Sequence, residues 1–149
     1  MRNCLPSALA LLTAIGAACY CVPSAAHELD AQLDCTMDAH SFIASLESDQ
    51  YIEPVPMHVE ANSVNAFRPT HGSELTAFGF RVYAVLGYEH DDEMFHKGSG
   101  EAMPGSLYGV IVFGPSESVK THLQDAGSDA AVHEVMPLIM TAVLCKSGD

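Results

Sequence analysis

Apolar residues divide the chain into a hydrophobic leader and a longer region in which apolar and polar positions alternate. Residues 5–18 are almost wholly apolar, follow the basic residue Arg2 and precede the small residues Ser24-Ala25-Ala26. This run is shorter than the roughly 20 residues of a membrane span and has the segment order of a secretion signal. The pattern therefore predicts a signal peptide over residues 1–26 and a single periplasmic domain over residues 27–149.

The periodicity beyond the leader predicts helices and strands in mixed order. Residues 38–47 form one predicted helix, with Phe42, Ile43 and Leu46 on one face, and a second helix is predicted to begin at Pro115. The predicted strands are 57–60, 75–88, 107–113, 131–135 and 138–144. This order favours an α+β fold, in which two helices pack on a mainly antiparallel sheet.

The segment between the first two predicted strands is harder to assign. Residues 62–73 contain Asn, Pro and Gly, which favour a loop or an interrupted edge strand. Within it, Phe67 and Arg68 are a second candidate binding surface. The alternative, which we favour, is that Phe67 packs into the core and Arg68 forms an internal ion pair.

The cysteines predict one disulfide. Three of the five lie in the predicted signal: Cys4, Cys19 and Cys21. Cys35 and Cys145 remain, one near each end of the mature domain, and such a pair in an oxidising compartment forms a bridge. Gly16-Ala17-Ala18-Cys19 also resembles a lipoprotein cleavage box, so lipidation of Cys19 is an alternative to cleavage after Ala26.

The charge of the chain restricts its partners. The formal net charge is −13, and all 19 acidic residues follow position 26. Nucleic acids and anionic lipids are repelled by such a surface, so we expect no nucleic-acid partner and no membrane insertion. A basic protein or a bound cation fits this charge.

No motif indicates catalysis. The sequence has no GxSxG elbow and no GxxxxGK phosphate loop, and the mature part has no cysteine beyond the predicted disulfide pair. We therefore predict that the protein is not an enzyme and needs no cofactor. A small enzyme or a structural factor of the envelope remains an alternative, with no residue to assign to it.

Metal binding is the main alternative function. Residues 89–96 contain His90 and His96 among several carboxylates, and these ligands suit Zn²⁺ or Cu²⁺. The histidines do not have the HxxxH spacing of a helical site or the HxH spacing of a strand site. The primary prediction therefore assigns no metal ligands.

The predicted loop over residues 89–105 is the best candidate for a protein-binding surface. It is longer than the roughly 12–15 residues at which an irregular connection implies a function. It combines acidic residues, apolar anchors and a Gly-Ser-Gly segment that we expect to act as a hinge. The predicted contact residues are Tyr88, Glu89, His90, Asp91, Asp92, Glu93, Met94, Phe95, Ser99, Glu101 and Met103.

This layout resembles a known family. The segments to compare are Asn62-Ser63-Val64-Asn65-Ala66-Phe67-Arg68-Pro69, residues 75–89 and Leu107-Tyr108-Gly109-Val110. In size and architecture the chain resembles the periplasmic immunity proteins that protect bacteria from cell-wall amidases injected by type VI secretion systems. Periplasmic lysozyme inhibitors share this general layout. The resemblance implies a noncovalent inhibitor that inserts a loop into the cleft of a basic secreted hydrolase, and it implies a homodimer.

Overall fold

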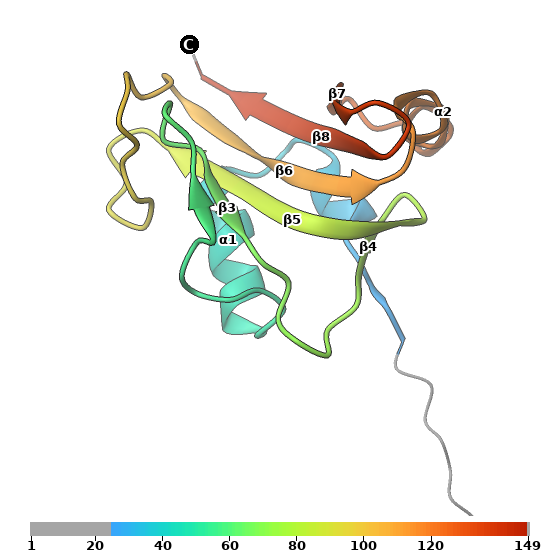
Figure 1. The fold of residues 1–149 in the computed structure, drawn as a ribbon, viewed down its shortest axis with the longest axis horizontal. Coiled ribbons are helices and arrows are strands. Elements are labelled where there is room, and N and C mark those ends of the chain that lie inside the picture. The colour runs from blue at the N-terminus through green and yellow to red at the C-terminus, as the bar shows by residue number, and fades with distance from the viewer. Residues whose placement is uncertain (1–24, 149) are drawn as a thin grey trace, which may run out of the picture.

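A computed structural model describes residues 25–148. Of the predicted signal peptide, only Ala25 and Ala26 are therefore described, and the alternative lipidation site at Cys19 lies outside the described residues. The described part is an α+β domain with an eight-stranded, mostly antiparallel sheet (Figure 1). Its elements are β1 (His27–Glu28), a short 3₁₀ turn (Asp30–Leu33), α1 (Ala39–Ser48), β2 (His58–Val59), β3 (Asn65–Phe67), β4 (Leu75–Ala77), β5 (Phe80–Glu89), β6 (Ser106–Phe113), α2 (Ser116–Ala126), β7 (Ala131–Met136) and β8 (Met140–Ser147). The predicted fold class is confirmed.

The sheet has its longest strands at its centre. The main strand order is β1-β4-β5-β6-β8-β7, and β3 also pairs with β5 and with β2. All pairs are antiparallel except β1 with β4, which makes the sheet mixed. The pairing of β5 with β6 brings the two ends of the predicted loop over residues 89–105 together, and the pairing of β6 with β8 places the second end next to the C-terminal end of β8.

Helix α1 begins where the sequence predicts. Asp38 caps it, because its side-chain Oδ1 accepts a hydrogen bond from the Ser41 backbone N–H at 2.7 Å. Phe42, Ile43 and Leu46 are buried, and the Phe42 ring lies 4.6 Å from the ring of Tyr108 in β6. The predicted apolar face of this helix is therefore the face that packs on the sheet.

Helix α2 follows Pro115 and ends at Gly127, which adopts the left-handed conformation with φ of 69°. Its buried residues are Val119 and Leu123, and Leu123 lines one groove together with Val132 of β7. Val132 pairs with Val143 of β8, and Val143 pairs with Val110 of β6. Paired residues point to the same face of a sheet, and so do residues two positions apart in one strand, so Val132 and Tyr108 share a face. Both helices thus cover the same face.

The prediction of a single strand over residues 75–88 is wrong, because these residues form a hairpin of two strands, β4 and most of β5. β4 ends at Ala77 and β5 begins at Phe80, with Ala77 paired to Phe80 across a two-residue turn. The turn residues Phe78 and Gly79 both have positive φ, at 51° and 84°. Phe78 is also buried, so its apolar side chain continues the alternating pattern of the two strands. For this reason the sequence pattern does not indicate that the chain reverses here.

Part of the segment predicted as a loop or edge strand lies inside the sheet. β3 pairs with β2 on one side and β5 on the other, and all three of its residues are buried. Phe67 is 1% exposed, which confirms that it belongs to the core. Arg68 is exposed and forms no ion pair within residues 25–148, so the predicted internal ion pair is wrong.

The predicted disulfide joins Cys35 to Cys145 across 110 positions of sequence. It links the segment between the 3₁₀ turn and α1 to strand β8, next to Tyr108 of β6. A disulfide is consistent with an extracytoplasmic protein. Within residues 25–148, no helix has the length and apolar character needed to cross a membrane.

Replacing Gly87 of β5 is expected to destabilise the fold by overpacking it. A Cβ atom at this position would lie 2.5 Å from Cγ1 of Ile43 in α1 and 3.0 Å from Cε1 of Phe95. We expect Gly87→Ala to lower the free energy of unfolding by about 1–3 kcal/mol in urea titrations. In an Ile43→Ala background, which removes the two nearest obstructing atoms, the same change is expected to have a smaller effect. Additive effects of the two substitutions would contradict this assignment.

Candidate functional site

The loop over residues 89–105 is fastened to the β2–β3 hairpin. Asn65 of β3 is fully buried, and its side-chain amide donates to the His96 carbonyl at 2.8 Å and accepts from the His96 N–H at 3.0 Å. The Gly98 N–H donates to Ser63 Oγ, and the Gly100 N–H donates to the Ala61 carbonyl. These bonds hold the middle of the loop against a buried strand.

The predicted Gly-Ser-Gly hinge is a packed contact in this structure. A Cβ atom at residue 98 would lie 2.0 Å from the Glu60 carbonyl oxygen and 2.7 Å from that of Ala61. Glycine is therefore required at Gly98 because the loop and the β2–β3 hairpin approach each other closely. The Met103 N–H, which donates to the Asn62 carbonyl at 3.1 Å, extends the contact further along the loop.

The start of the loop is fastened to the N-terminus of α1. Glu89 accepts a hydrogen bond from the His40 backbone N–H at 3.0 Å, and the His40 ring Nδ1 lies 2.6 Å from Asp92 Oδ2. Asp92 also accepts from the Met94 N–H through its other oxygen. Carboxylates at a helix N-terminus are favourable because the free N–H groups there carry partial positive charge. Glu89 and Asp92 thus position the loop.

The four apolar residues predicted as anchors lie on the inner side of the loop. Tyr88 and Phe95 are each 4% exposed, and Met94 and Met103 are partly buried against the core. In this conformation the two aromatic rings are not available to a partner. Their burial attaches the loop to the domain in addition to the hydrogen bonds.

The outer side of the loop is polar and mainly acidic. The residues from the predicted contact set that are exposed are His90, Asp91, Glu93, Ser99 and Glu101. The Asp91 side chain is 86% exposed, whereas that of Asp92 is 20% exposed. The loop therefore presents the three exposed carboxylates of Asp91, Glu93 and Glu101 on a backbone that is fixed by hydrogen bonds to the β2–β3 hairpin and to α1.

The structure does not gather the predicted alternative metal ligands into a site. Within residues 25–148 there is no group of three or more His, Cys, Asp or Glu side chains placed to hold an ion. His90 lies 3.5 Å from the Asp91 carboxylate, and both side chains are more than half exposed.

His40 is the titratable group whose state affects the loop. The Asp92 carboxylate raises the pKa of His40 above its ordinary value, first by its hydrogen bond and then by its charge, and Glu89 and Asp38 contribute less. Because the pKa is raised in the folded state, the protonated imidazole stabilises the fold fully below about pH 6.5. That contribution is lost as the pH rises through the raised pKa.

Substitution of His40 is therefore expected to change stability in a pH-dependent way. We expect His40→Gln to lower the thermal midpoint most near pH 5.5 and progressively less towards about pH 8.5. The matched control is His133→Gln, because the His133 ring forms no ion pair in the part of the chain that the structure describes. A difference between His40→Gln and the wild type that does not vary with pH would exclude this role.

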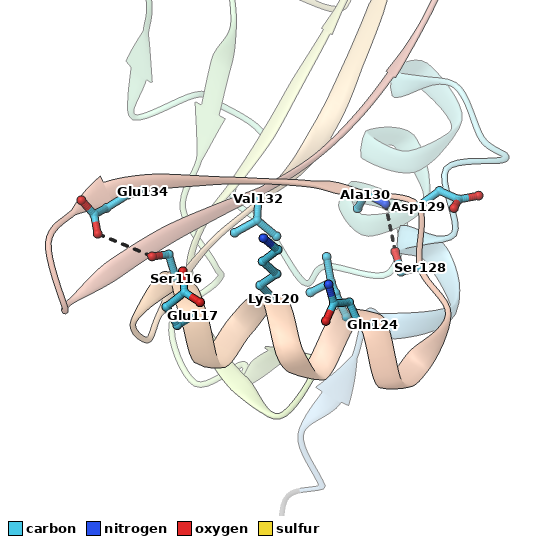
Figure 2. Close-up of a pocket in the computed structure, with 10 residues that line it drawn as sticks. Ser116, Glu117, Lys120, Gln124, Ser128, Asp129, Ala130, Val132 and Glu134 are labelled. Carbon is cyan, nitrogen blue, oxygen red and sulfur yellow. Dashed lines mark hydrogen bonds between the residues drawn. The ribbon is translucent and has the colours of Figure 1, made fainter.

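Two exposed features were not predicted from the sequence. The tip of the β7–β8 hairpin exposes Val135, Met136, Leu138 and Ile139, of which Leu138 is 80% exposed. A groove of ≈ 410 Å³ lies between α2 and β7, and Lys120 extends across it towards Val132 (Figure 2). Exposure of this kind depends on strand order, since β7 lies at the sheet edge.

The comparisons with known proteins assign no family. No model of a known protein family, no curated protein and no solved structure matches this chain.

Proposed function

We propose that the protein is a periplasmic inhibitor of the immunity type, which binds a basic, secreted peptidoglycan amidase of a type VI secretion system. In this proposal, the loop over residues 89–105 enters the active-site cleft of the amidase and excludes peptidoglycan. The observation that supports it most is the state of the loop: it is long, projects exposed carboxylates, and is fastened from behind at both ends and in the middle.

A fastened loop suits an inhibitor because it is already ordered before binding. A flexible loop of this length would lose conformational freedom in the complex, at a cost of about 0.5–1.5 kcal/mol for each side chain that becomes immobile. Here Asn65, Ser63 and the buried rings of Tyr88 and Phe95 hold the backbone in advance. The favourable free energy of contact with the partner is then not reduced by the cost of ordering the loop, and the affinity is higher.

The charge of the exposed side supports a basic partner. Asp91, Glu93 and Glu101 are exposed, and no lysine or arginine within residues 25–148 forms an ion pair with them. Complementary charges accelerate the encounter of two proteins and disfavour acidic competitors. The predicted secretion signal and the disulfide are consistent with action outside the cytoplasm.

The proposal is tested by capturing the partner with the mature, oxidised protein. We expect immobilised protein, incubated with lysate and secretome of the producing cells, to retain one stoichiometric basic protein. Mass spectrometry should identify it as a peptidoglycan amidase, and added inhibitor should stop its hydrolysis of purified peptidoglycan. A preparation that captures no hydrolase but retains about one Zn²⁺ or Cu²⁺ per chain after dialysis would contradict the proposal in favour of metal binding.

A further inference from the structure

A cleft of ≈ 870 Å³ opens between the β3–β4 connection and the first half of β5. Arg68, His71 and Ser73 line it from the connection, and Arg81 and Tyr83 line it from β5. Phe113, at the end of β6, forms its floor on the sheet. Phe113 alternates with the fully buried Val112 and so lies on the face opposite the helices. This cleft is separate from the loop over residues 89–105, which joins the other ends of β5 and β6.

The cleft concentrates positive charge in an acidic protein. The chain has only six Lys and Arg residues against 19 Asp and Glu, yet Arg68 and Arg81 both line this cleft, together with His71. Neither guanidinium forms an ion pair within residues 25–148. Glu74 is the single acidic residue of the lining. A pair of guanidinium groups without carboxylate partners leaves its N–H donors available to an oxyanion.

Aromatic side chains hold one of these guanidinium groups in place. The Arg81 Cζ lies 4.9 Å from the centroid of the Phe113 ring, in a cation–π contact. The Tyr83 ring meets the Phe113 ring edge to face, with 5.6 Å between centroids and 78° between planes. A guanidinium held against a ring face can still donate two N–H groups to one oxyanion in a bidentate contact. Tyr83 is 45% exposed, so part of its side chain is open to a ligand in the cleft.

We propose that this cleft binds a small ligand that joins an oxyanion to a planar ring. The oxyanion, a phosphate or a carboxylate, takes the N–H donors of Arg81 and Arg68, and the ring packs against Tyr83. The hydroxyl groups of Thr70 and Ser73, which also line the cleft, supply further donors. This site is independent of the proposed inhibitory loop, because it shares no residue with it.

The overall negative charge of the protein weakens the binding of an anion but does not prevent binding in this cleft. Charges farther away than about 8–10 Å are largely screened at physiological ionic strength, so the local pair of arginines dominates. We therefore expect an affinity that is modest and that decreases as salt is added.

The test is a calorimetric titration of the mature, oxidised protein with phenyl phosphate, phenylacetate and inorganic phosphate. We expect saturable binding of at least one of the two ring-bearing anions, and tighter binding of phenyl phosphate than of inorganic phosphate. Binding of phenyl phosphate alone assigns a phosphate ligand, and binding of phenylacetate alone assigns a carboxylate ligand. Absence of saturable binding by both ring-bearing anions would overturn the proposal.

Three variants assign the binding to the cleft. Arg81→Gln is expected to weaken binding about tenfold, because a charge-assisted bidentate contact is lost. Tyr83→Ala should weaken the binding of the two ring-bearing anions and leave the binding of inorganic phosphate unchanged. Lys120→Gln removes an equal charge from the α2–β7 groove, whose lining shares no residue with the cleft, and should have no effect. If Arg81→Gln does not fold, Arg68→Gln serves in its place. Equal loss of binding in the arginine and Lys120 variants would also overturn the proposal.

Discussion

Removal of the Cys35–Cys145 disulfide is expected to lower the free energy of unfolding by about 4–5 kcal/mol. The bridge spans 110 positions, so in the unfolded chain it constrains nearly the whole described domain. Cys145 is 2% exposed and lies beside Tyr108, whose hydroxyl donates to the Gln32 carbonyl at 3.1 Å. The loss therefore also loosens the contact between the N-terminal segment and the sheet.

This loss is large compared with the stability of an ordinary domain, which is roughly 5–15 kcal/mol. We expect the Cys35→Ala/Cys145→Ala double variant and the reduced wild type to unfold at similar, much lower urea concentrations than the oxidised wild type. The agreement between variant and reduced protein serves as the control, because it separates loss of the bridge from loss of the sulfur atoms. A decrease of less than about 1 kcal/mol in both would show that the bridge does not stabilise the domain.

Neutralising the exposed carboxylates of the loop is expected to weaken partner binding about 10- to 100-fold. The variant is Asp91→Asn/Glu93→Gln/Glu101→Gln, which keeps the shape of each side chain and removes three charges. These side chains accept no hydrogen bond from the rest of the described chain, so the fold should be unaffected. Part of the change should appear in the association rate, because complementary charges accelerate the encounter of the two proteins.

A matched variant controls for general loss of negative charge. Glu117→Gln/Asp125→Asn/Asp129→Asn removes three exposed charges from α2 and the segment after it, away from the loop. Surface plasmon resonance with the captured hydrolase should show a near-normal association rate for this control. Equal reductions for both triple variants would mean that the whole acidic surface steers the partner and that the loop has no special role.

Local patterns in the sequence predicted the elements that depend on neighbouring residues. Asp38 and the spacing of Phe42, Ile43 and Leu46 indicated α1 correctly, and elimination of the leader cysteines left the pair that forms the disulfide. The evidence for α1 lies within a few neighbouring residues, and the evidence for the disulfide lies in the number of cysteines.

Contacts between distant segments could not be predicted in this way. The turn at Phe78-Gly79 looked like strand because a buried apolar residue occupies it. The fastening of the loop depends on the Asn65 side chain, which is 31 positions from His96, and no periodicity indicates that pairing. The same is true of Arg68 and Arg81, which share a cleft only because β3 is followed by a connection that returns beside β5.

The bounds of the loop over residues 89–105 were therefore predicted from the sequence, whereas its internal organisation was not. Residues 89–105 stood out by length and charge, which are visible in sequence. Phe95 is buried where its ring lies beside Gly87 of β5, a residue of another element, whereas Asp91 and Glu93 of the same loop are exposed.

The most direct test of the proposed function is inhibition of the captured hydrolase by the wild type and by the loop variant. Release of soluble fragments from purified peptidoglycan is measured as each protein is added. We predict complete inhibition by the wild type at one inhibitor per enzyme, and a shift to markedly higher concentrations for Asp91→Asn/Glu93→Gln/Glu101→Gln. Binding of the wild type without inhibition, or equal inhibition by the loop variant, would contradict the assignment of residues 89–105 as the inhibitory loop.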